Sequence, residues 1–100
     1  MSSTTRVARI HDAIEQVLDA THVQVIDHSA AHAGHAGAEA GGGHYEVIVV
    51  SEKFKGVSRL AAQRLVYSAL GDLMAAEIHA LTMHTYTPDK WRERADAGSR

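Results

Sequence analysis

The chain has 100 residues, with ten Lys and Arg against twelve Asp and Glu, eight histidines and no cysteine. This length predicts a single domain that buries about two thirds of its unfolded surface. The net charge of −2 argues against a global attraction to nucleic acid or anionic membranes. The lack of cysteine excludes disulfides, a thiol nucleophile and thiolate metal ligands from this chain.

Two further function classes find no support in the sequence. No apolar run approaches the roughly 18 residues of a membrane-spanning helix, and the N-terminus lacks a secretory apolar region, so we expect a cytoplasmic protein without membrane association. A Gly-x-Ser-x-Gly elbow, a phosphate-binding Gly-Lys-Ser/Thr loop and paired carboxylates on one predicted face are all missing. We therefore expect the chain not to be an enzyme.

Apolar spacing predicts the elements of the first half. Val7, Ile10 and Ile14 recur at helical intervals, which predicts a helix over about residues 5–20. β-Branched runs predict a strand at 23–27 and a central strand at 44–51, where both faces are apolar. Residues 29–43 hold no Val, Ile, Leu, Met or aromatic residue and predict a flexible loop, with an Ala-rich helical turn as the alternative.

Caps and breakers predict the elements of the second half. After a turn at 52–56, Ser58 can cap a helix that Gly71 breaks or bends, and Asp72 can open a second, short helix to about residue 77. Residues 78–86 then form a third strand. Thr87 and Pro88 begin a last helix anchored by Trp91, and residues 92–100 trail off without an anchor.

The third strand is expected to alternate strictly between its two faces. One face would carry Ile78, Ala80, Thr82, His84 and Tyr86, and the other His79, Leu81, Met83 and Thr85.

The order α-β-β-α-α-β-α predicts an α+β fold. The first two strands form an antiparallel hairpin, and a right-handed helical crossover places the third strand parallel to its neighbour. Helices then cover one face of a small three-stranded mixed sheet, an architecture of the K-homology-like kind. We expect one domain over 1–100, with its core over about 6–94, and with a flexible loop at 29–43 and a flexible tail at 95–100.

Three stretches resemble the BolA family. They are residues 44–56 (HYEVIVVSEKFKG), residues 64–70 (RLVYSAL) and residues 78–88 (IHALTMHTYTP) followed by Trp91. The resemblance runs in one register from about residue 6 to 94. It implies a class II K-homology-like α/β fold, in agreement with the predicted order of elements.

The resemblance also implies partners and a cofactor. BolA-like proteins pair with monothiol glutaredoxins, and the pair holds a bridging [2Fe–2S] cluster to which the BolA side gives histidine. Glutathione comes with the partner. The resemblance thus indicates an adaptor for iron–sulfur trafficking or iron signalling. Alone, we expect the chain to be a monomer or a weak dimer.

The family motif assigns candidate cluster ligands. The histidine of the Ile/Val-His-Ala-Leu motif matches His79. The family spacing Asp-x-Ser-x-x-His matches residues 27–32 (DHSAAH), which makes His32 the first choice for the loop ligand and His35 the alternate. Imidazole can replace thiolate on such a cluster and makes the bond sensitive to protonation.

Some family members are transcriptional regulators that bind DNA, which is the alternative function. Lys53, Lys55, Arg59 and Arg64 form a basic turn and helix start that could meet phosphates or an acidic partner. Against nucleic acid, residues 58–77 lack the Gly-x-x-Gly loop of K-homology domains. Ala62 and Gln63 also stand where many members carry Arg-His, which removes positive charge from this helix.

The remaining histidines are interpreted more simply. His84 is expected to be a hydrogen-bonded residue of a sheet face, and His11, His22, His28 and His44 to be structural or solvated. A minor alternative is that the loop alone binds Zn²⁺ or Ni²⁺ through His28, His32, His35 and His44, although nothing in the sequence fixes their geometry.

Overall fold

A three-stranded mixed sheet organises the computed structural model, which describes residues 3–28, 43–76 and 78–98. The elements follow the predicted order. They are α1 (Ser3–Leu18), β1 (His22–Asp27), β2 (Gly43–Val50), the short 3₁₀ helix η3 (Glu52–Phe54), α2 (Arg59–Leu70), α3 (Asp72–Ala76), β3 (Ile78–Tyr86) and α4 (Pro88–Gly98).

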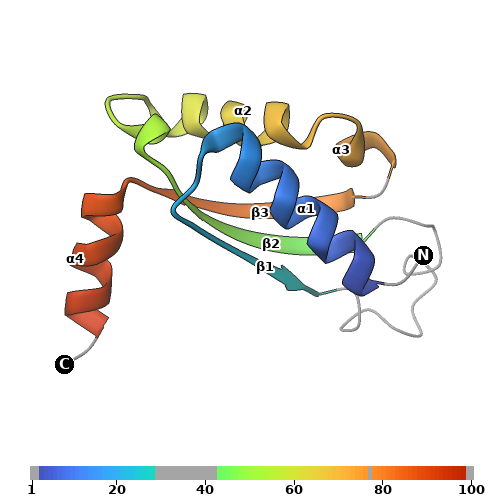
Figure 1. Ribbon diagram of the computed structural model, residues 1–100, viewed down its shortest axis with the longest axis horizontal. Coiled ribbons are helices and arrows are strands. Elements are labelled where there is room, and N and C mark those ends of the chain that lie inside the picture. The colour runs from blue at the N-terminus through green and yellow to red at the C-terminus, as the bar shows by residue number, and fades with distance from the viewer. Residues whose placement is uncertain (1–2, 29–42, 77, 99–100) are drawn as a thin grey trace.

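β2 is the central strand, as its two apolar faces predict. It pairs antiparallel with β1 and parallel with β3, so the sheet order is β1-β2-β3 and β3 is an edge strand. Figure 1 shows α1 and α2 over one face of the sheet, while α4 extends from the far end of β3 toward the other side. The prediction that helices cover one face therefore holds for α1 and α2, and α4 is the exception.

The core lies between this sheet face and the helices α1 and α2. Ile10, Ile14 and Leu18 of α1 are at most 2% exposed. They pack in one cluster with Val47 of β2 and Val66 of α2. Burial of each such side chain contributes about 1.5–3 kcal/mol, so this single layer supplies most of the driving force for folding.

The predicted caps are confirmed. The Ser58 hydroxyl accepts a hydrogen bond from the Ala61 N–H at 3.1 Å, and the Thr87 hydroxyl accepts one from the Lys90 N–H at 3.3 Å. Gly71 ends α2 with φ of 52°, a left-handed conformation that costs glycine little. The α2–α3 boundary is thus fixed by local chemistry, as the sequence indicated.

Ser51 is a buried polar residue where several elements meet. Its hydroxyl donates to the Leu18 carbonyl at 2.6 Å and accepts from the Lys53 N–H at 3.1 Å. Its backbone N–H donates to the Tyr86 carbonyl at 3.0 Å. One residue therefore joins the end of α1, the start of η3 and the end of β3.

The end of the last helix and the start of β2 differ from expectation. The last helix continues to Gly98 rather than trailing off after Trp91. Its exposed residues include good helix formers, and an Arg92–Asp89 ion pair one turn apart supports it without a buried anchor. The loop expected over 29–43 lies outside the described residues except for Gly43, where β2 begins. None of the described helices has the length and apolar character needed to cross a bilayer.

We predict that Ser51→Ala lowers the free energy of unfolding by about 1–3 kcal/mol, because the Leu18 carbonyl loses its donor and the Lys53 N–H its acceptor in a buried place. Urea unfolding followed by circular dichroism measures this. The matched control is Ser68→Ala on the exposed side of α2, which should change the free energy by less than about 0.5 kcal/mol. Equal effects of the two substitutions would contradict the role of Ser51.

Candidate functional site

The His79 backbone lies at the start of β3, where the pairing with β2 is irregular. Gly43 pairs with Ile78 and His44 with Ala80, so His79 is an extra residue without a Cα partner in the register. Such a β-bulge locally changes the direction in which a strand presents its residues. The predicted cluster ligand from the strand therefore occupies a special backbone position rather than an ordinary one.

The predicted alternation of β3 is wrong at the start of the strand, where the bulge lies. Ile78 was expected to share a face with Thr82 and His84, but it is 6% exposed and belongs to the core cluster. The extra residue places Ile78 and Ala80 on opposite faces of the sheet, because strand alternation with a period of two is preserved only where the ladder is unbroken. Leu81 and Met83, which were predicted to share a face, both pack against the core.

The ends of the 29–42 segment lie at the same end of the sheet as His79. The backbone N–H of His28 donates to the backbone carbonyl of His44 at 2.8 Å, which holds together the residues that precede and follow the segment. Gly43, the first residue after it, is paired with Ile78. The topology therefore brings both ends of this segment to the start of β3. His32 and His35 themselves lie outside the described residues, as does the side chain of His79.

Glu46 bridges two histidines on the sheet face that α1 and α2 leave uncovered. Its carboxylate contacts His28 Nε2 at 2.9 Å through Oε1 and His84 Nε2 at 2.8 Å through Oε2. The three residues come from β2, the residue after β1, and β3. His84 is thus a hydrogen-bonded residue of a sheet face, as predicted, whereas Glu46 was not singled out from the sequence.

The two histidines lower the pKa of Glu46 below its ordinary value. The largest cause is the hydrogen bond from His28, followed by that from His84, and partial burial opposes them. The hydrogen bonds favour the charged carboxylate, so this group remains an acceptor into mildly acidic solution. The cluster links β3 to the residue that enters the 29–42 segment.

The metal-binding alternative gains little from the described residues. His28 and His44 are neighbours at the end of the hairpin, but the Nε2 atom of His28 already contacts Glu46. Among the residues that the structure describes, one trio has donor atoms within 4.8 Å of one another, namely His11, Asp12 and Glu15 on α1. This trio lies on the outer side of one helix and shares no residue with the predicted histidine loop.

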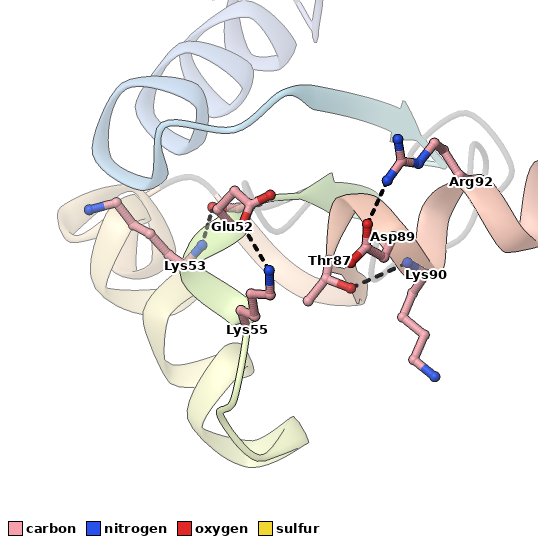
Figure 2. Close-up of polar contacts among 8 residues, drawn as sticks. Glu52, Lys53, Lys55, Thr87, Asp89, Lys90 and Arg92 are labelled. Atoms are coloured by element: carbon pink, nitrogen blue, oxygen red, sulfur yellow. Dashed lines mark hydrogen bonds and ion pairs between the residues drawn. The ribbon is translucent and has the colours of Figure 1, made fainter.

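The residues predicted to meet nucleic acid are all exposed, and they are divided between the turn at η3 and the helix α2. Lys53 and Lys55 lie in and just after η3, and Figure 2 shows Lys55 paired with Glu52, at 3.8 Å, while Lys53 extends away from the drawn side chains. Arg59 and Arg64 are five residues apart on α2, which separates them by about 140° around the helix. The two helix cations therefore present charge in different directions.

An aromatic cluster holds α4 on the sheet face that α1 and α2 leave uncovered. The rings of Trp91 and His22 stack with centroids 5.0 Å apart, and Tyr86 lies 5.3 Å from Trp91. The Arg94 guanidinium lies 5.5 Å from the Trp91 ring and 5.7 Å from the Tyr86 ring, within cation–π distance. Trp91 is thus the anchor that the sequence predicted.

The element order, the mixed sheet and the helix layer define an α+β protein of the class II K-homology-like kind. The family model described as BolA-like protein matches residues 14–90. The chain belongs to the BolA family, whose members are not enzymes.

Several relatives illustrate this membership. The chain is 40% identical over 86 residues to BolA-like protein 1 of Mus musculus, covering 86% of this chain and 61% of that protein. It is 33% identical over 88 residues to the DNA-binding transcriptional regulator BolA of Escherichia coli, covering 88% of this chain and 81% of that protein. The solution structure of mouse BolA1 superimposes with a TM-score of 0.74 at 38% identity, over 90% of this chain and 71% of that one.

We predict that Glu46→Gln flattens the acid limb of the stability curve. Because the folded-state pKa of Glu46 lies below its unfolded value, its contribution is full above about pH 4.5 and is lost as the pH falls through the folded-state value. Urea unfolding between neutral pH and pH 3 measures this. The substitution His28→Ala should flatten the same limb, and the double variant should lose less than the sum of the two. Parallel curves for wild type and Glu46→Gln would contradict the pairing.

Proposed function

We propose that this chain is an adaptor that binds a monothiol glutaredoxin and shares a bridging [2Fe–2S] cluster with it. His79 would be the strand ligand and His32 the loop ligand, with His35 as the alternate. The partner, together with glutathione, would bring the thiolates. The adaptor would thereby take part in iron–sulfur trafficking or iron signalling.

The observation that carries this proposal is the position of His79. Its backbone lies at the bulge that starts β3, next to Gly43, where the chain returns from the segment that holds His32 and His35. A donor on a strand and a donor on an adjoining segment can meet one metal ion without rearrangement of the sheet. The family relationship supports the same pairing.

The donor chemistry of the chain fits such a shared site. The chain has eight histidines and no cysteine, so it can offer imidazole but no thiolate. When bound, the cluster supplies one-electron redox chemistry, whose potential and stability depend on the ligands. Histidine ligands must be deprotonated to bind, so the residues of this chain would make the association dependent on pH.

A second candidate function is regulation of transcription through DNA. Relatives in Escherichia coli and Vibrio cholerae carry the name DNA-binding transcriptional regulator BolA. The exposed cations Lys53, Lys55, Arg59 and Arg64 are the residues of this chain that would meet phosphates. Their separation over η3 and two sides of α2 makes this the weaker candidate. A specific DNA complex with a steep salt dependence would favour it.

We predict that apo-protein added to a cluster-loaded monothiol glutaredoxin produces a new visible circular dichroism spectrum, and that His79→Ala abolishes this spectrum. The reason is that replacement of a thiolate by imidazole alters the cluster's electronic transitions. His32→Ala and His35→Ala, measured in parallel, identify the loop ligand. His11→Ala on α1 is the matched control and should behave as wild type.

The outcomes separate partner binding from ligand assignment. A new spectrum that survives His79→Ala would retain the partner and remove His79 from the site. An unchanged spectrum with both proteins folded would contradict the cluster proposal, and DNA binding would then be measured with Lys53→Gln and Arg64→Gln variants.

A further inference from the structure

A cavity of about 730 Å³ lies at the opposite end of β3 from His79. The start of α2 and the preceding turn form one wall, the second half of β3 forms the base, and α4 forms the other wall. Nine residues of strand span about 30 Å, so His79 and Tyr86 are separated by about 23 Å. The cavity is therefore a separate site, and its role is independent of the proposed cluster.

The cavity runs along the free edge of β3. Residues 83–87 all line it, although successive side chains of a strand point to opposite faces. Its walls come from α2 on one side of the sheet and α4 on the other (Figure 1), so it lies beside a strand edge, and β3 is an edge strand. The Ser51 N–H donates to the Tyr86 carbonyl, so Tyr86 and His84 direct their backbone groups toward β2. Met83 and Thr85 consequently direct theirs toward the cavity.

The two walls differ in chemistry. On the side of α2, the lining combines the apolar side chains Phe54, Val57 and Ala62 with the polar Ser58, Arg59 and Gln63, and Val57 is 41% exposed. On the side of α4, Lys90 and Arg94 line the cavity. An added strand would direct alternate side chains to these walls, because its residues alternate like those of β3.

The charge of the lining is positive. Arg59, Lys90 and Arg94 are opposed by one carboxylate, Glu93. Neither Arg59 nor Lys90 has an ion pair within the described part of the chain, and Figure 2 shows the Lys90 side chain extending away from its helix. These cations are available to carboxylates of a partner in a groove whose lining is partly apolar.

We propose that this groove binds an extended acidic segment of a partner protein, which adds to β3 as a fourth strand. Backbone hydrogen bonds to Met83 and Thr85 would hold the segment. Its apolar residues would face Phe54 and Val57, its alternating acidic residues would face Lys90 and Arg94, and Arg59 would add positive charge from the α2 wall. This is recognition by β-strand addition, in which the backbone gives affinity and alternate side chains give specificity.

The lining favours a peptide over single-stranded nucleic acid. Bases bind to such surfaces by stacking on exposed aromatic rings. Here Trp91 already stacks on His22, and Arg94 covers both Tyr86 and Trp91. Of the four cations predicted to meet nucleic acid, only Arg59 lines the groove. A second copy of this chain is disfavoured because it would bring the same cations to the same edge.

The test uses fluorescence anisotropy of the full chain at low ionic strength with a fluorescein-labelled peptide of five valine–glutamate repeats. We expect saturable binding that weakens about tenfold for the double variant Lys90→Gln, Arg59→Gln. The control double variant Lys53→Gln, Arg64→Gln changes the same net charge outside the groove and should bind as wild type. The valine–glutamine peptide should bind at least tenfold more weakly than the valine–glutamate peptide.

Strand addition itself is tested without altering the protein. One synthetic peptide carries N-methyl groups on every valine and a second on every glutamate. Only one of the two sets faces β3, so one peptide should lose binding and the other should retain it. Equal binding of both peptides, or equal loss in both double variants, would overturn the proposal. Binding of oligo-dT but not of the valine–glutamate peptide, or self-association that buries the β3 edge, would also overturn it.

Discussion

A buried hydroxyl sets the geometry at the far end of the sheet. Ser51 bonds to the last turn of α1 through Leu18 and to the start of η3 through Lys53, while its N–H reaches the end of β3 at Tyr86. The residue is 0% exposed, so each of these bonds is made away from water, where an unpaired group is costly. Ser51 directly follows β2 and bonds to the end of β3, and these two strand ends lead into the turn before α2 and into α4.

Much of the fold follows from local chemistry that the sequence displays. Two apolar faces identify β2 as central, and the hydroxyls of Ser58 and Thr87 mark two helix starts. The bulge at His79 could not be predicted in this way, because strand alternation assumes an unbroken ladder. The extra residue lets both Ile78 and Leu81 pack against the core, and this packing depends on tertiary structure. The continuation of α4 to Gly98 was also missed, since an exposed helix leaves no apolar period.

The candidate site likewise has a part that the sequence indicates and a part that only the folded structure shows. The family motif singles out His79 as the proposed strand ligand, but Glu46 lacked any signal in the sequence because its partners come from β3 and from beyond β1. Only the strand register places these three residues together. The basic residues show that nearness in sequence does not place side chains on one surface, since Arg59 and Arg64 are close in sequence and point apart on α2. Lys90 and Arg94 meet Arg59 at one groove only because Trp91 holds α4 against His22 and Tyr86.

An uncovered strand edge is a hazard as well as an opportunity, because it can template the edge-to-edge growth that leads to amyloid. The edge of β3 is interrupted at its start by the bulge at His79 and is closed at its end by Pro88, which has no N–H to donate. Lys90 and Arg94 add like charges that repel an identical edge. The fold thus keeps one strand edge open while protecting the protein from polymerising through it.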